Sequence, residues 1–284
     1  MIKYLRLLNT GFQSAALNMA LDEAILIRYI EEKAPPTLRA FRWQQPAISL
    51  GRFQDVEREI CTDVCEQLGI ALVRRPTGGR AVYHRDEFTY SMVIGKREGV
   101  PSGVVAAYVH LAQGLVAALQ ILGVQAAVVT RDRAIGDGTN AGSTVHQASA
   151  ACFASTTQAD LSSGGLKLVG SAQVWKEGGL LQQGSLPIDD RAAEFFSMLR
   201  YPSEAARQQA LAAYYKRTQP LHVFAPGATW DDIADAFARG FATAFQVEAI
   251  PAEVEPEEWK LAEQLVEEKY SKLPWRKERI RLVE

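Results

Sequence analysis

One stretch of this 284-residue sequence combines residue types that bind a charged ligand: residues 72–84 read "LVRRPTGGRAVYH". Paired glycines between two apolar, strand-like runs let backbone N–H groups approach a ligand closely. The neighbouring Arg74, Arg75 and Arg80 suggest that this ligand carries an anion. The stretch has neither the GxxxxGK[ST] pattern of a P-loop nor a GxGxxG turn. It therefore predicts an anion-binding glycine loop of another kind.

A second candidate for chemistry is a thiol followed by an amine, Cys152 and Lys167. Cys152 lies in a segment, residues 136–165, that is rich in Gly, Ser, Thr and Ala and has no Lys or Arg. A lone cysteine is more often a buried small residue, but this polar setting favours an exposed thiol. A nearby cation such as Lys167 would stabilise the reactive thiolate. His84 and His146 are candidate bases, although one histidine is a weak signal.

The other two cysteines, Cys61 and Cys65, lie four residues apart in "VEREICTDVCEQLG", which has the pattern of one amphipathic helix. No His or Cys pair at zinc-finger spacing accompanies them, so we expect core residues and no metal site. The N-terminus has no pattern of a secretory signal, which favours a reducing cytoplasm without disulfides. The net charge of −2 argues against nucleic-acid binding as the main role.

The elements that must position these residues follow from the hydrophobic periodicity. Residues 99–130 carry no charged side chain. Because His, Gln, Pro and Gly interrupt this run, it predicts a buried core helix over 103–122 and a strand over 125–130, with no membrane span. The same segment is a candidate wall for an apolar slot. Residues 166–188 predict a β-hairpin that turns at 176–179.

Strands on either side of helices predict an α+β domain with a mixed β-sheet flanked by helices. Residues 1–250 are expected to form the main domain, and residues 251–284 a short C-terminal helical appendage. Helices are predicted over residues 14–32, 190–198, 203–216, 229–245 and 256–270.

Five motifs together give the chain a resemblance to the superfamily of lipoate-protein ligases, octanoyltransferases and biotin ligases: "NMALDEAIL", "SLGRFQD", "VRRPTGGRAVYH", "KLVGSAQ" and "LQQGSL". They cover most of residues 1–190. The resemblance implies a catalytic domain related to class II aminoacyl-tRNA synthetases. It also implies a tunnel for an acyl chain and its activated carbonyl end, lined by Arg75, Thr77, Gly78, Gly79, His84, Gly170, Ser171 and Ala172. Lys167 matches the family lysine beside the reacting carbonyl.

Within this superfamily the chain is most similar to the LipM type of octanoyltransferase. Cys152 precedes Lys167 by fifteen residues, which corresponds to the place of the nucleophilic cysteine in that type. Thr77, Arg80 and Arg85 stand where ligases commonly show Ser, Gly and Asp. The resemblance thus implies octanoyl transfer through a Cys152 thioester, with Lys167 polarising the carbonyl, and with no cofactor and no metal.

The implied partners are an octanoyl-acyl carrier protein as donor and a lipoyl domain, such as the glycine-cleavage H protein, as acceptor. Arg74, Arg80 and Arg85 are candidates for docking an acidic carrier protein. Three alternatives remain. An ATP- and Mg²⁺-dependent lipoate-protein ligase would not need Cys152. An octanoyl amidotransferase between two lipoyl domains would need it. A non-catalytic acyl-binding sensor would leave Cys152 and Lys167 without roles.

Overall fold

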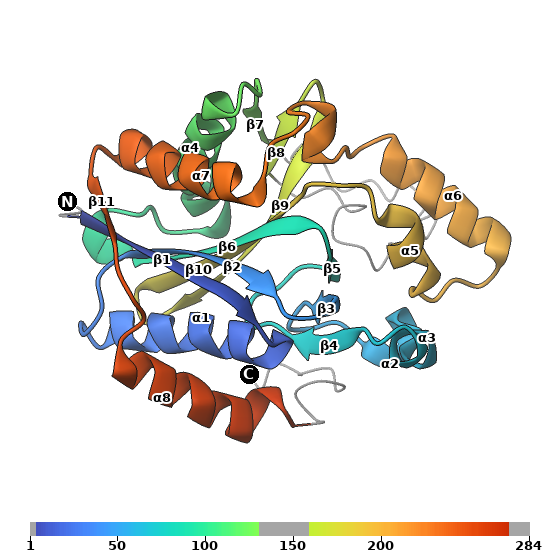
Figure 1. Ribbon diagram of the computed structural model, residues 1–284, viewed down its shortest axis with the longest axis horizontal. Helices are drawn as coiled ribbons and strands as arrows, with labels where there is room; N and C mark the ends of the chain where they lie inside the picture. Colours follow the sequence, from blue (N-terminus) through green and yellow to red (C-terminus); the bar gives the residue numbers. More distant parts are fainter. Residues whose placement is uncertain (1–3, 131–158, 273–284) are drawn as a thin grey trace, which may run out of the picture.

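The computed structural model describes residues 4–130 and 159–272. Within these ranges the chain forms an eight-stranded mixed sheet in the order β11-β1-β2-β6-β10-β9-β8-β7. A three-stranded sheet, in the order β4-β3-β5, lies beside it (Figure 1). The predicted mixed sheet flanked by helices is confirmed.

The strands of the large sheet are β1 (Tyr4–Gln13), β2 (Thr37–Trp43), β6 (Glu87–Gly95), β7 (Ala127–Thr130), β8 (Ala159–Ser163), β9 (Leu166–Lys176), β10 (Gly179–Pro187) and β11 (Glu248–Pro251). The small sheet contains β3 (Ala47–Leu50), β4 (Ala71–Arg74) and β5 (Val82–His84). The predicted hairpin is β9 and β10, which pair antiparallel from Lys176 and Gly179 onward.

The α-helices are α1 (Ala15–Ile30), α2 (Val56–Glu59), α3 (Thr62–Gln67), α4 (Val104–Ile121), α5 (Ala192–Ser197), α6 (Glu204–Tyr215), α7 (Trp230–Phe245) and α8 (Pro256–Leu265). Short turns of 3₁₀ helix cover Lys96–Glu98 and Leu221–Val223, and a π-helical turn, Val266–Tyr270, extends α8. Helices α4 and α7 pack together on one face of the large sheet, while α1 and α8 cover the other (Figure 1).

Helix α4 is long and apolar enough, by length and composition, to cross a membrane. Its inner face instead belongs to the core that it shares with α7. A Cβ added at Gly114 would lie 2.6 Å from the Phe241 ring, so the two helices are in close contact there. The predicted core helix is therefore confirmed.

The predicted single helix over "VEREICTDVCEQLG" is wrong. The chain forms α2 and α3 with a break at Ile60 and Cys61. Ile60 forms an isolated antiparallel bridge with Leu199, and the Cys61 N–H donates to the Met198 carbonyl at 2.8 Å. These tertiary hydrogen bonds interrupt the helix before Cys61, which is the N-cap of α3 and accepts a hydrogen bond from the Cys65 N–H at 3.1 Å.

The end of the described chain is fixed to the main sheet by an ion pair. Glu258 of α8 is fully buried, and its carboxylate accepts two hydrogen bonds from Arg6 of β1, at 2.6 and 3.0 Å. Removing one partner of a buried pair of this kind typically costs about 4 kcal/mol. Helix α8 thus covers α1 and the first strand together.

Candidate active site

Five of the eight predicted tunnel residues line one narrow pocket between the small sheet and strands β9 and β10, whereas Thr77, Gly78 and Gly79 do not line it. Met19, Phe41 and Trp43 supply apolar walls. The predicted residues that line it are Arg75, His84, Gly170, Ser171 and Ala172. Its volume of about 30 Å³ is of the order of one water molecule, so an acyl chain can enter only if side chains of the lining move. We call it the acyl pocket.

None of the α4 residues lines this pocket. The expectation that the uncharged segment lines the slot is therefore not met at this pocket. The reason is topological, because α4 packs on the sheet face that also carries α7, whereas residues of α1 and β2 contribute to the acyl pocket.

His84 is held on both sides of its ring by hydrogen bonds. Its Nε2 lies 2.7 Å from Ser49 Oγ, and its Nδ1 contacts Glu87 Oε1. Trp43 stacks on the imidazole with 3.9 Å between ring centroids. Since a carboxylate accepts from Nδ1–H, this arrangement favours the tautomer in which Nε2 is the acceptor and the Ser49 hydroxyl donates. The geometry is that of a Ser–His–acid chain in the pocket wall.

The glycine loop is braced from within by Arg75. Its guanidinium donates to the carbonyls of Ser49, Gly78 and Arg80, at 2.7–2.9 Å, and its Nε donates to Thr77 Oγ1 at 3.1 Å. The donors of Arg75 are therefore directed at the protein's own loop. Arg75 suggested an anion site in the sequence, but in the structure its hydrogen bonds hold the glycine loop in position.

Two glycines allow this loop to lie against its neighbours. Gly79 has a φ of 88°, in the left-handed region that glycine adopts readily. A Cβ added at Gly51, at the end of β3, would lie 2.0 Å from the Gly79 carbonyl oxygen. Ala172 of β9 faces Gly79 from the other side, with its Cβ 3.7 Å from the ideal Gly79 Cβ position. Small residues on both sides thus fix where the loop runs.

A buried polar chain connects the loop to the centre of the sheet. Thr77 Oγ1 donates to Gln183 Oε1 at 2.8 Å, and Gln183 Nε2 donates to Asp22 at 2.6 Å. Asp22 in turn forms a 2.6 Å ion pair with Arg39, and neither side chain is exposed. Burial lowers the pKa of Arg39, while the Asp22 carboxylate opposes that shift. Helix α1 therefore supplies, through Asp22, the charged group at which this series of buried hydrogen bonds is anchored.

Lys167 is buried and carries an ion pair that the sequence did not reveal. Its Nζ lies 2.8 Å from Asp160 Oδ1 of β8, and the two side chains are 7% and 12% exposed. Its backbone N–H donates to the Arg217 carbonyl at 2.7 Å. The Lys167 ammonium group therefore does not face bulk solvent, and Asp160 fixes its position.

The proposed docking arginines differ from the expectation. Arg74 is fully buried, and its guanidinium donates to the carbonyls of Gly51 and Gln54. The prediction that Arg74 docks a carrier protein is therefore wrong, because it cannot reach a partner. Arg80 pairs with Glu59 at 3.2 Å, and Arg85 pairs with Glu194 at 2.8 Å, so each already has a carboxylate partner.

Cys152 and His146 lie outside the described residues, and their roles stay predictions. Of the described cysteines, Cys65 is buried as predicted, and burial raises the pKa of its thiol from 9.0 to about 11. Cys61 is only partly buried. At neutral pH Cys65 is therefore a protonated packing residue, not a nucleophile.

Sequence reasoning missed several residues that build the site. Ser49, Asp22 and Gln183 lie within "SLGRFQD", "NMALDEAIL" and "LQQGSL", so the motifs contained them without indicating that they meet. Glu87 follows His84 by three residues, a spacing that alone carries little information. Asp160 had no signal, because only the pairing of β8 with β9 brings it to Lys167.

The fold is similar to that of two solved lipoate-protein ligase structures. Over 99% of this chain and 98% of the other, it is similar to a chain in the structure of a bipartite lipoate protein ligase and its E2 lipoyl domain from Thermoplasma acidophilum, with a TM-score of 0.77 and 24% identity. A lipoate-protein ligase A bound with ATP gives a TM-score of 0.76, also at 24% identity, over 99% and 100%. At this identity the likeness is one of fold.

The family model of the lipoyl protein ligase A/B catalytic domain matches residues 14–242. The chain belongs to this family, as its motifs predicted. An octanoyltransferase LipM from Moorella thermoacetica is 40% identical over 96% of this chain and 98% of its own length. One from Symbiobacterium thermophilum is 37% identical over 95% and 97%. The resemblance to LipM-type octanoyltransferases is confirmed.

Proposed function

We propose that this protein is an octanoyltransferase of protein lipoylation that works through a thioester on Cys152. The observation that carries the proposal is the full-length similarity to LipM octanoyltransferases, at 40% identity in one relative. Octanoyl transfer and an acyltransferase activity follow from this similarity. The convergence of Arg75, His84 and Gly170–Ala172 on one pocket supports an acyl group as the ligand.

The donor in this proposal is octanoyl-acyl carrier protein. The Cys152 thiolate attacks the donor carbonyl, the new C–S bond forms as the old one breaks, and the departing thiolate takes up a proton. Exchange of one thioester for another is nearly neutral in free energy, so no nucleotide cofactor or metal is required. Burying seven carbons beyond the carbonyl contributes up to about 5 kcal/mol to acyl binding.

The acceptor is a lysine of a lipoyl domain, such as that of the glycine-cleavage H protein. Its neutral amine attacks the acyl-enzyme, an N–C bond replaces the bond to Cys152, and one amine proton passes to the Cys152 thiolate. Amide formation from a thioester is downhill. Lys167, held by Asp160, would polarise the carbonyl oxygen as negative charge develops on it. We place the protein in the cytoplasm, where both partners would be found.

The test is intact-protein mass spectrometry of wild type and Cys152→Ala after mixing with octanoyl-acyl carrier protein without ATP. We expect an octanoyl adduct on wild type that the variant lacks. A variant that transfers at the wild-type rate would contradict the covalent route. Activity that requires free lipoate, ATP and Mg²⁺ would support the ligase instead, and a donor limited to octanoylated lipoyl domains would support the amidotransferase.

A further inference from the structure

A second, larger cavity adjoins the acyl pocket. Its volume is about 300 Å³, and it lies between the β5–β6 segment, the end of β10, and helices α5 and α6. That volume is at the lower end of the range for small-ligand sites, and it suits a side chain better than a nucleotide. We call it the outer cavity.

The outer cavity touches both parts of the candidate active site. Val82 lines the outer cavity and the acyl pocket alike. Glu87, which contacts His84 in the acyl pocket, also lines the outer cavity. Thr218 and Gln219 in its wall pair through their backbones with Lys167. A group that enters this cavity therefore arrives between the pocket wall and the strand that carries Lys167.

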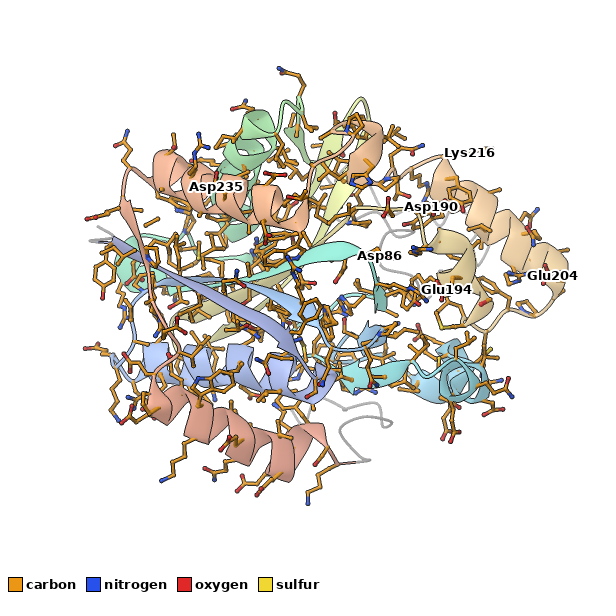
Figure 2. All side chains as sticks on the ribbon, in the orientation of Figure 1. Asp86, Asp190, Glu194, Glu204, Lys216 and Asp235 are labelled. Carbon is orange, nitrogen blue, oxygen red and sulfur yellow. The ribbon has the colours of Figure 1, made fainter. Side chains whose placement is uncertain are left out.

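The carboxylates of the lining leave the outer cavity negative. Asp189 and Asp190 are exposed, whereas the Glu87 side chain is only 4% exposed. Two arginines also line the cavity, and each is paired with a carboxylate that is not part of the lining. Arg85 binds Glu194 at 2.8 Å, and Arg191 binds Asp86 at 2.6 Å. Figure 2 shows Asp86, Asp190 and Glu194 gathered around α5.

The partner of Asp190 does not cancel its charge, whereas Asp189 pairs with a histidine that is charged only when protonated. Asp189 Oδ1 lies 2.8 Å from His222 Nδ1, and Asp190 accepts a hydrogen bond from the backbone N–H of Ala192 at 2.9 Å. A backbone donor adds no net charge. With the two arginines paired elsewhere, the entrance of the cavity attracts a cation.

The other walls of the outer cavity are aromatic. Tyr83 and Phe195 stack with 5.8 Å between ring centroids, and Tyr214 and Tyr215 form an edge-on pair at 5.8 Å. Aromatic faces pack against methylene groups and also attract an ammonium group. Aromatic walls together with carboxylates are the combination that recognises a long, flexible amine.

We propose that the outer cavity binds the side chain of the acceptor lysine. Asp189 and Asp190 attract the ammonium group to the entrance of the cavity. Once the side chain has entered, its methylene groups pack against the tyrosines and Phe195. Glu87 faces the amine from the inner part of the cavity. This inference rests on the proposed function and adds the place where its second substrate enters.

The lining favours the acceptor lysine over the phosphopantetheine arm of the donor, which must also reach the active site. A phosphopantetheine arm carries a phosphate, which Asp189 and Asp190 would repel. A separate cavity of about 420 Å³ also borders His84 and shares Arg85, Glu87 and Asp189 with the outer cavity. Its wall lacks Asp190, the tyrosines and the residues that pair with Lys167, so its position suits the lysine less well than that of the outer cavity.

The experiment separates the two half-reactions. Acyl-enzyme prepared from octanoyl-acyl carrier protein is isolated and mixed with either Nα-acetyl-lysine amide, a cationic amine, or hydroxylamine, which is uncharged near pH 7. Wild type is compared with Asp189→Asn/Asp190→Asn, and with Asp235→Asn as a matched control. Asp235 is exposed on α7, away from the cavity, and pairs with Arg239 (Figure 2).

We expect the double variant to lose about tenfold in the rate with the lysine amide, since two exposed charge contacts each contribute up to roughly fivefold. Its rate with hydroxylamine should stay within about twofold of wild type, and Asp235→Asn should change neither rate. In the complete reaction, the KM for the lipoyl domain should rise with little change in kcat.

Two results would overturn the proposal. Equal loss with both nucleophiles would mean that the aspartates support the reacting thioester or the fold, and unchanged rates with both would mean that the amine enters elsewhere. If wild type formed no acyl-enzyme, the covalent route would be contradicted instead. In that case, the KM for the lipoyl domain in the complete reaction, compared between wild type and the double variant, would still test whether the outer cavity binds the acceptor lysine.

Discussion

Gln183 Nε2 donates a hydrogen bond to Asp22 Oδ2 at 2.6 Å, and this contact connects the first helix to a strand that is 161 residues away in sequence. Gln183 Oε1 in turn accepts a hydrogen bond from Thr77, so the series of hydrogen bonds continues to the glycine loop. The loop is therefore positioned from the centre of the sheet. Its orientation depends on a buried charge pair, Asp22 with Arg39, that does not itself line the acyl pocket.

Gln183→Leu should test this support. The substitution leaves Asp22 and Thr77 each with one hydrogen-bond partner fewer, so we expect about 1–3 kcal/mol less stability. For a protein of this size that corresponds to a fall in Tm of several degrees, roughly 2–4 °C per kcal/mol. Thermal unfolding measures it. Gln208→Leu, on the exposed side of α6, is the control, and an equal shift in both would refute a special role for Gln183.

The close approach of Gly51 to Gly79 predicts a sharp difference between two glycine-to-alanine variants. In Gly51→Ala the new Cβ would lie 2.0 Å from the Gly79 carbonyl oxygen, so the loop must move. We expect about 1–3 kcal/mol of destabilisation together with reduced transfer. At Gly78 an added Cβ meets nothing within 4 Å, so Gly78→Ala should keep its melting temperature. Similar melting curves for the two variants would contradict the structure.

The Lys167–Asp160 pair should matter for rate more than for acceptor binding. Asp160→Asn removes the charge that fixes the ammonium group, and misplacement of a catalytic group can cost up to about 100-fold. We expect kcat of octanoyl transfer to fall by roughly 10- to 100-fold with a small change in KM. Steady-state kinetics at several lipoyl-domain concentrations separate the two constants. A loss confined to KM would argue against the positioning role of Asp160.

Cys65 predicts a dependence of stability on pH. Because burial raises the pKa of its thiol to about 11, the folded protein keeps a proton that the unfolded chain loses near pH 9. The stability contributed by this group is complete below pH 9 and declines between pH 9 and 11. Comparing denaturant unfolding of wild type and Cys65→Ala across this range isolates the effect. Parallel profiles for the two proteins would show that the thiol does not contribute.

The same burial predicts that Cys65 is inert in the native protein at neutral pH. Iodoacetamide at pH 8 should leave Cys65 unmodified, because thiolate is the reactive form and the side chain is 1% exposed. Peptide mapping after quenching measures the modification, and a sample unfolded in denaturant is the positive control. Rapid labelling of Cys65 in the native protein would contradict its placement in the core.

Several features could be predicted from the sequence because their signals are local. The periodicity of residues 103–122 and the turn at 176–179 fix a helix and a hairpin wherever they are packed. The family followed from five short motifs, since their residue types and order are specific. By contrast, the break between α2 and α3 escaped prediction, because the hydrogen bonds of Cys61 with Met198 and of Glu59 with Arg200 involve a segment about 140 residues away.

The sequence by itself therefore determined the fold class, the family and five of the residues that line the acyl pocket. Only the tertiary structure decided what each of them does there. It turned Arg74 and Arg75 from anion-binding candidates into braces of the loop, gave His84 its partners Ser49 and Glu87, and brought Asp160 to Lys167. The physical reason is that hydrogen bonds and ion pairs depend on distances between residues far apart in the chain, whereas motifs and periodicity record only neighbours in sequence.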